Sequence, residues 1–152
     1  MNRALKLAKK GMLLGEVPVG AVVVKNNKVI GEGFNSPITT HDPSAHAEIM
    51  AIRMAALHEN NYRLSDDSTL YVTLEPCSMC AGLIVHARIN RVIFAAYEPK
   101  SGVVESQNRF FAQPFLNHKV QTAGGLLAEE SAALLRQFFK LRRLNKSNHK
   151  IE

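Results

Sequence analysis

Three side chains able to bind a metal ion are divided between two short motifs, H-A-E at residues 46–48 and P-C-S-M-C at residues 76–80. They are His46, Cys77 and Cys80. The two cysteines are three residues apart, so both thiols face the same side of a helix. Three protein ligands with a fourth position open to water are typical of catalytic zinc, whereas structural zinc usually has four protein ligands. A chain with these motifs is therefore expected to fold so that both segments meet at one metal ion.

The chain has 152 residues, and we expect a single domain over 1–152 with a flexible basic tail over about 145–152. A chain of this length buries about 68–70% of the surface that its unfolded state exposes. No segment has the apolar character of a signal sequence or a membrane span. Both cysteines fall in one motif, which leaves no disulfide framework. These features predict a cytoplasmic protein.

The charge of the chain is basic, with 19 lysines and arginines against 13 aspartates and glutamates and a net charge of +6. A basic balance suits a polyanionic partner such as a nucleic acid. A solvated basic surface without such a partner explains the charge equally well. The charge by itself leaves both interpretations open.

The apolar residues recur with helical and strand periods in turn along the chain. They predict helices at 3–14, 42–58, 76–87 and 128–143, and strands at 19–24, 28–34, 69–74, 91–96 and 119–122. The residues expected on the buried side of the first helix are Leu5, Ala8, Met12 and Leu13. This order indicates an α/β fold in which helices cover a sheet.

The connections between these elements carry their own signals. Residues 35–42 are expected to form a loop, and residues 97–117 are rich in loop signals. Asp42 and Pro43 are interpreted as the N-cap and the first residue of the second helix. Pro76 is expected to open the third helix, whose N-terminal dipole favours the thiolates of the cysteines.

His46 and Glu48 are two residues apart, so in a regular helix their side chains point about 200° from each other. They can serve one site only if the metal and the substrate lie off the N-terminal end of the helix. The position of both residues shortly after Asp42 favours that geometry.

The pattern H-x-E followed by P-C-x-x-C is the signature of zinc deaminases, in which the glutamate is not a metal ligand. Zinc lowers the pKa of its bound water to about 7. Glu48 would then act as general base and as general acid, taking the proton and passing it to the ring and to the departing amine. Taken one at a time, the same residues have other interpretations. The two cysteines could form a redox-active C-x-x-C motif, His46 could cap a helix, and Glu48 could be a first-turn glutamate favoured by the helix dipole. The metal site could also belong to a zinc-binding module without catalytic activity.

Longer stretches resemble the bacterial tRNA-specific adenosine deaminase family. They are EVPVGAV at 16–22, HDPSAHAEI at 41–49, LYVTLEPCSMCAG at 70–82, RINRV at 88–92 and GLLAEE at 125–130. The resemblance implies a three-layer α/β/α cytidine-deaminase-like fold with a central mixed five-stranded sheet, a homodimer, and one Zn²⁺ per subunit. It implies a hydrolase that acts on a C–N bond and converts adenosine to inosine at position 34 of an arginine tRNA.

The resemblance also assigns roles to single residues. It implies zinc binding by His46, Cys77 and Cys80 and proton transfer by Glu48. Substrate contacts are implied for Asn35, Pro18, Val19, Lys100, Phe139 and Arg142.

Several of these substrate residues have plainer interpretations. Asn35 could be an ordinary turn residue, and Pro18 and Val19 could simply begin a strand. In the last helix, Phe138 and Phe139 are adjacent, and we expect one to be core and Phe139 to be the more exposed. Exposed aromatics and arginines there suit the unstacked bases of an anticodon loop.

The main alternative is a deaminase of a free base or nucleoside, such as guanine, cytosine or cytidine. Its zinc chemistry would be the same. A small neutral base requires neither the basic charge nor the aromatic and basic last helix, which favours tRNA as the partner.

Overall fold

A computed structural model describes residues 1–64 and 67–148, with side chains up to residue 145. Its centre is one five-stranded sheet in the order β2-β1-β3-β4-β5. The strands are β1 (Gly20–Lys25), β2 (Lys28–Phe34), β3 (Thr69–Leu74), β4 (Arg91–Ala96) and β5 (Gln121–Gly124). The first three pair antiparallel, whereas β3, β4 and β5 run parallel, so the predicted mixed sheet is confirmed.

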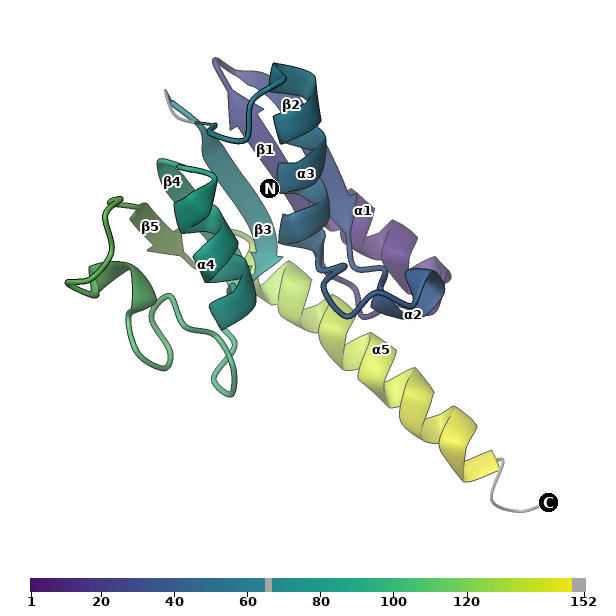
Figure 1. Cartoon of the computed structure of the whole chain (residues 1–152). Coiled ribbons are helices and arrows are strands. Elements are labelled where there is room, and N and C mark those ends of the chain that lie inside the picture. The colour runs from purple at the N-terminus through teal and green to yellow at the C-terminus, as the bar shows by residue number, and fades with distance from the viewer. Residues whose placement is uncertain (65–66, 149–152) are drawn as a thin grey trace.

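Helices cover both faces of this sheet (Figure 1). They are α1 (Asn2–Leu13), α2 (Pro37–Thr40), α3 (Ala47–Glu59), α4 (Ser78–His86) and α5 (Ala128–Asn148), with a 3-10 turn η1 (Phe110–Ala112). α3 contacts α4, and α1 contacts α5, so the helices form two layers with the sheet between them. The predicted three-layer α/β/α architecture is confirmed.

The core lies between the sheet and its helices. Phe94, Leu70 and Ile84 are among its largest fully buried side chains, and they come from β4, β3 and α4. Leu5 and Ala8 of α1 are buried as predicted. Leu13 was expected on the buried side and is 88% exposed, because it is the last residue of α1 and has turned away from the sheet.

The second predicted helix begins later than expected. α3 starts at Ala47 with His46 as its N-cap, whereas Asp42 was predicted to be the cap. The Oδ1 atom of Asp42 instead accepts hydrogen bonds from the backbone N–H of Ser44 at 2.8 Å and from its hydroxyl at 2.7 Å. Asp42 thus forms a local turn, and the expected loop at 35–42 contains the short helix α2.

Two glycines of β2 let α3 lie unusually close to the sheet. A Cβ atom on Gly31 would stand 2.2 Å from the carbonyl oxygen of Ala51, and one on Gly33 would stand 2.6 Å from that of Ala47. Real Cβ atoms essentially never approach so closely, so the contact requires glycine at both positions. The helix that carries Glu48 is therefore pressed directly onto β2.

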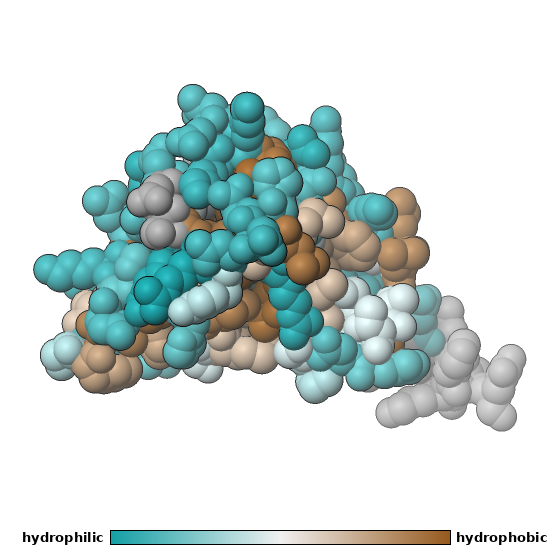
Figure 2. Space-filling model, turned by 45° about the horizontal axis from the view of Figure 1, so that its top comes forward, coloured by the Kyte–Doolittle hydropathy of each residue, from teal (hydrophilic) through white to brown (hydrophobic). Residues whose placement is uncertain are grey.

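α5 is longer than predicted and reaches Asn148 instead of residue 143. It packs on β3, β4 and α1, and its C-terminal half projects from the body (Figure 1). Residues 149–152 of the expected tail lie outside the described residues. The face shown in Figure 2 is mostly hydrophilic, with hydrophobic residues gathered in smaller areas. Within 1–64 and 67–148, no helix has the length and apolar character that crossing a membrane requires.

Candidate active site

The predicted metal ligands lie where two helices begin. His46 is the N-cap of α3 and Cys77 is the N-cap of α4, and both have extended backbones with ψ of 152° and 175°. Cys80 lies one turn into α4 and is buried. α3 and α4 both begin at the end of the sheet where β3 finishes (Figure 1). The fold thus brings together two motifs that are far apart in sequence.

The distances within this cluster fit zinc. The Nδ1 atom of His46 lies 3.7 Å from the Sγ of Cys77 and 3.6 Å from the Sγ of Cys80. All three ligand atoms lie within 4.8 Å of one another. With Zn–S of about 2.3 Å and Zn–N of about 2.0–2.1 Å, tetrahedral geometry places a sulfur and a nitrogen ligand about 3.6 Å apart. The three side chains are therefore already spaced for one tetrahedral metal ion.

The two thiols differ in acidity because they share a hydrogen bond. The bond from Cys80 lowers the pKa of Cys77 to about 4, burial opposes this, and His46 adds to it. The same hydrogen bond and burial raise the pKa of Cys80. The pKa of His46 is raised, chiefly by its hydrogen bond with Cys77. The pKa of Cys77 is thus shifted towards the thiolate, the form that binds metals.

Glu48 lies beside the cluster without belonging to it. It is in the first turn of α3 and only 4% exposed. Burial raises the pKa of Glu48 to about 7, and a hydrogen bond connects its side chain to Cys80. A pKa near neutrality is typical of a group that both takes and gives protons. His46 is the N-cap and Glu48 the second residue of α3, so both lie at the N-terminal end of the helix, where a shared site requires them.

Asn35 lies close to this site, directly after β2. Its backbone N–H donates to the carbonyl of Val19 at 3.0 Å, and its Oδ1 accepts from the backbone N–H of Ala47 at 2.9 Å. Pro18 and Val19 are buried, and Val19 belongs to the hydrophobic core. Asn35 therefore joins the start of β1 to the start of α3.

The other predicted substrate residues lie on separate elements. Lys100 is exposed in the turn after β4, where its backbone N–H donates to Glu98. Phe138 is 5% exposed and Phe139 is 44% exposed, so the predicted difference between them is confirmed. The guanidinium of Arg142 stands over the ring of Phe138, 5.6 Å from its centre. α5 thus offers an aromatic ring and cations next to one another on its projecting part.

Two buried glutamates, Glu16 and Glu75, have no role in the interpretation of the sequence. Glu16 is fully buried and accepts hydrogen bonds from the N–H and the hydroxyl of Thr39, both at 2.7 Å. Glu75, directly before Pro76, is 3% exposed. Burial would raise the pKa of Glu75, but hydrogen bonds from Ser106 and from backbone amides outweigh it and hold the pKa below its usual value. The sequence does carry a signal for such residues, namely a glutamate within an apolar segment. A carboxylate buried with such a segment is almost never without hydrogen-bond or charge partners.

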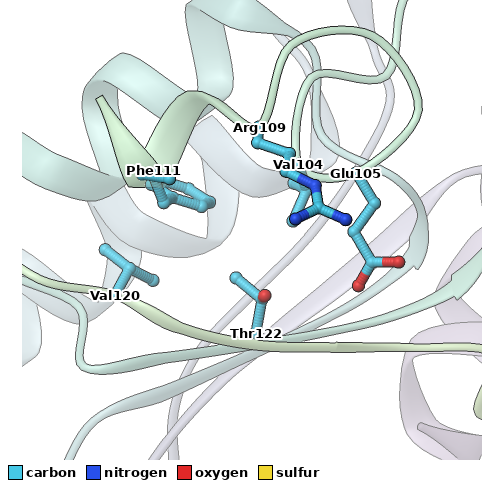
Figure 3. A pocket seen from close by; sticks show the side chains of 7 residues that line it. Val104, Glu105, Arg109, Phe111, Val120 and Thr122 are labelled. Carbon is cyan, nitrogen blue, oxygen red and sulfur yellow. The ribbon is translucent and has the colours of Figure 1, made fainter.

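A separate pocket of about 410 Å³ lies between the segment before η1 and strand β5 (Figure 3). Val104, Phe111 and Val120 form its apolar walls, and Glu105 and Arg109 carry its charges. The predicted metal ligands and Glu48 are not among its lining residues. We therefore place the chemistry at the cluster and not in this pocket.

Comparison with known proteins supports this choice. Residues 1–96 match the family described as the cytidine and deoxycytidylate deaminase zinc-binding region. This segment contains the whole cluster, so its metal cofactor is zinc.

The relatives differ in how similar they are to the chain. A tRNA-specific adenosine deaminase of Haemophilus influenzae is 50% identical over 99% of this chain and 87% of its own length. A structure solved in work on A-to-I editing by tRNA:A34 deaminases has a TM-score of 0.86 at 45% identity, over 89% of this chain and 97% of that one. A guanine deaminase of Bacillus subtilis has a TM-score of 0.61 at 34% identity, over 93% and 90%. Both the sequence and the fold are thus more similar to the tRNA enzymes.

Proposed function

The chain belongs to the tRNA-specific adenosine deaminases, a group of the zinc-dependent cytidine and deoxycytidylate deaminases, and on this premise we propose how its residues convert adenosine to inosine at wobble position 34 of tRNA. The reaction adds water and releases ammonia. The observation that carries the proposal is the meeting of His46, Cys77 and Cys80 beside the buried carboxylate of Glu48.

His46 Nδ1 and the sulfur atoms of Cys77 and Cys80 would hold zinc, and each cysteine would bind it as a thiolate. Bound zinc supplies a water whose pKa is about 7. Cys80 is buried and Cys77 is half-buried, so two thiolates there would be costly without a cation, and the N-terminus of α4 lowers that cost.

Glu48 moves the protons. Its carboxylate would carry both protons of the added water, the first to the ring nitrogen and the second to the amino group that leaves as ammonia. The carboxylate is buried, and the first turn of α3 fixes its position. One carboxylate thus serves as base and then as acid.

Asn35 orients the nucleoside. Because its Oδ1 is occupied by the N–H of Ala47, its Nδ2 is the atom that can donate to an acceptor on the substrate. Pro18 and Val19 support the wall behind the base, and Lys100, Phe139 and Arg142 contact the anticodon loop. The substrate is an arginine tRNA, as the family resemblance implies.

The test is inosine formation on an arginine anticodon stem-loop with adenosine at position 34, with guanine and cytidine assayed in parallel. We expect turnover of the stem-loop only. Glu48→Gln should retain zinc and lower the rate by about 10²–10⁴-fold. Glu59→Gln, a glutamate at the other end of α3, is the matched control and should retain the rate. Turnover of a free base without turnover of the stem-loop would reject the tRNA assignment and keep the zinc chemistry.

We further propose that the protein is a homodimer. Met54 and Leu57 of α3 are exposed, and with Phe34 and Met50 they border a pocket of about 390 Å³. Exposed apolar surface of this kind favours contact with another protein. Sedimentation should give the mass of a dimer for the wild type and of a monomer for Leu57→Glu. Leu13→Glu, a comparably exposed position at the end of α1, should remain dimeric.

We also place the protein in the cytoplasm as one zinc-dependent deaminase domain. Both cysteines are free, and zinc ligation requires reduced thiols. Fractionation of cells that express a tagged protein, with inosine measured in their tRNA, tests this location.

A further inference from the structure

Glu75 is a buried carboxylate with four hydrogen-bond donors around it. Its Oε1 accepts from the backbone N–H groups of Glu105 at 2.8 Å and Ser106 at 2.9 Å. Its Oε2 accepts from the backbone N–H of Glu98 at 3.0 Å and from the hydroxyl of Ser106 at 2.5 Å. All four donors belong to residues 98–106, which we call the β4 loop. The side chain of Glu75 thus forms hydrogen bonds with both ends of the β4 loop.

The loop also closes tightly over Glu75. A Cβ atom on Gly102 would stand 2.5 Å from the carboxylate carbon of Glu75, so only glycine allows this approach. The N–H of Gly102 donates to the carbonyl of Glu98 at 2.8 Å, and the N–H of Val103 donates to that of Pro76 at 3.0 Å. The loop is therefore folded around residues 75 and 76, directly before the metal ligand Cys77.

The backbone of Glu75 is itself anchored to the sheet. Its N–H donates to the carbonyl of Ala96 at 2.9 Å, just after the pairing of Leu74 with Ala96. Because β3 and β4 are parallel, their C-terminal ends lie at the same end of the sheet. The β4 loop, which follows β4, thus lies at the end where Cys77 follows β3.

The shape of the β4 loop depends on Glu75 because no regular element supports it. Residues 98–106 contain no helix or strand. The loop carries the exposed Lys100, and its residues Val104 and Glu105 line the pocket of Figure 3. Charge-assisted hydrogen bonds to a carboxylate are stronger than neutral ones. Removing them should therefore release the loop while the sheet remains folded.

We propose that Glu75 is a positioning residue that fixes the β4 loop against the RNA next to the target base. It takes no part in proton transfer and binds no zinc. The part concerning RNA rests on the proposed function, whereas the fixing of the loop does not.

The decisive variant is Glu75→Gln, which has nearly the same shape. Its amide NH₂ replaces one acceptor oxygen and faces donors, so at least one backbone N–H of the loop loses its partner. We would measure hydrogen exchange over residues 98–106, zinc per chain, and kcat and KM on the stem-loop. We expect faster exchange in the loop, unchanged zinc, and a KM increased about tenfold or more with a smaller change in kcat.

Two further variants make the experiment specific. Glu59→Gln replaces a hydrogen-bonded glutamate at the far end of α3 and should change neither loop exchange nor KM. Ser106→Ala removes one donor but keeps the carboxylate, so it should increase loop exchange and KM less than Glu75→Gln does. If Glu75→Gln does not fold, the test rests on Ser106→Ala. Loop exchange and KM equal to those of the wild type in this variant would then overturn the proposal.

The following results would contradict the proposal or the function on which it rests. Unchanged loop exchange and KM in Glu75→Gln would overturn the proposal. Loss of zinc or a fall in kcat alone would also overturn it, because Glu75 would then act on the cluster. If the wild type does not deaminate the stem-loop, the proposed function fails, and the loop exchange still decides whether Glu75 fixes the loop.

Discussion

The side-chain oxygen of Asn35 accepts a hydrogen bond of 2.9 Å from the backbone N–H of Ala47, the residue between His46 and Glu48. The first N–H groups of a helix have no partner within the helix, and the N-cap His46 makes no side-chain capping bond here. Asn35, which follows β2, thus accepts the helix N–H hydrogen bond that the side chain of an N-cap residue usually accepts. The orientation of the catalytic turn depends on a residue outside it.

We expect two substitutions of Asn35 to separate this structural role from substrate binding. Asn35→Asp keeps an acceptor for Ala47 but lacks the NH₂ group, so zinc content and thermal stability should remain near wild type while stem-loop deamination falls. Asn35→Ala should in addition lose about 0.5–2 kcal/mol of unfolding free energy, as other lost caps do. Urea unfolding and inosine assays measure both. Full activity in Asn35→Asp would show that the side-chain NH₂ does not contact the substrate.

Zinc removal should destabilise the protein. A ligand that binds only the folded state adds about 4.1 kcal/mol when its free concentration is 1,000 times its Kd. Chelation or His46→Ala should therefore lower zinc from one per chain to none and lower the Tm. His86→Ala, an exposed histidine at the end of α4, is the control and should keep its zinc. Equal zinc in the two variants would exclude His46 as a ligand.

The adjacent phenylalanines of α5 should behave differently. Phe138 is buried, so Phe138→Ala should cost about 3–5 kcal/mol of unfolding free energy. Phe139 is exposed, so Phe139→Ala should leave stability nearly unchanged and weaken stem-loop binding by about 1–3 kcal/mol, or about 5–150-fold in Kd. Denaturant titration and binding assays at a fixed salt concentration separate the two effects. Unaltered RNA binding in Phe139→Ala would remove this ring from the interface.

Glu59 should make stability depend on pH. The hydrogen bond from Lys25, followed by that from His58, holds the pKa of Glu59 below its usual value in the folded state. A carboxyl with a lowered folded pKa adds stability above its unfolded pKa of about 4.3 and loses it as the pH falls through the folded pKa. Wild type should thus be more stable than Glu59→Gln at pH 7, and the difference should shrink below about pH 4.3. A difference that grows in acid would contradict this assignment.

Local patterns were enough to predict the sheet and the zinc motifs. The strand bounds agree with the predicted ones to within two residues, because β-branched runs bounded by turns are local features. Pro76 correctly indicated a helix start near the cysteines, but α4 begins at Ser78 with Cys77 as its N-cap, two residues later than predicted.

Contacts between distant residues caused the errors and the omissions. Asp42 resembles an N-cap, but an aspartate that accepts from the N–H two residues later forms a turn with the same local signature. The true start of α3 is set by Asn35, twelve residues before Ala47. The partners of Glu75 lie more than twenty residues away, so no local pattern could identify its role.

The close contact of Gly31 and Gly33 with α3 limits how this protein can acquire a new specificity. The helix that bears Glu48 packs directly on the backbone of β2, and any side chain at these two positions would push it away from the sheet. Evolution towards a differently sized base must therefore proceed through the surrounding loops. Mutant libraries intended to change the accepted base should accordingly be concentrated in residues 16–19 and 98–106 and should leave the glycines of β2 untouched.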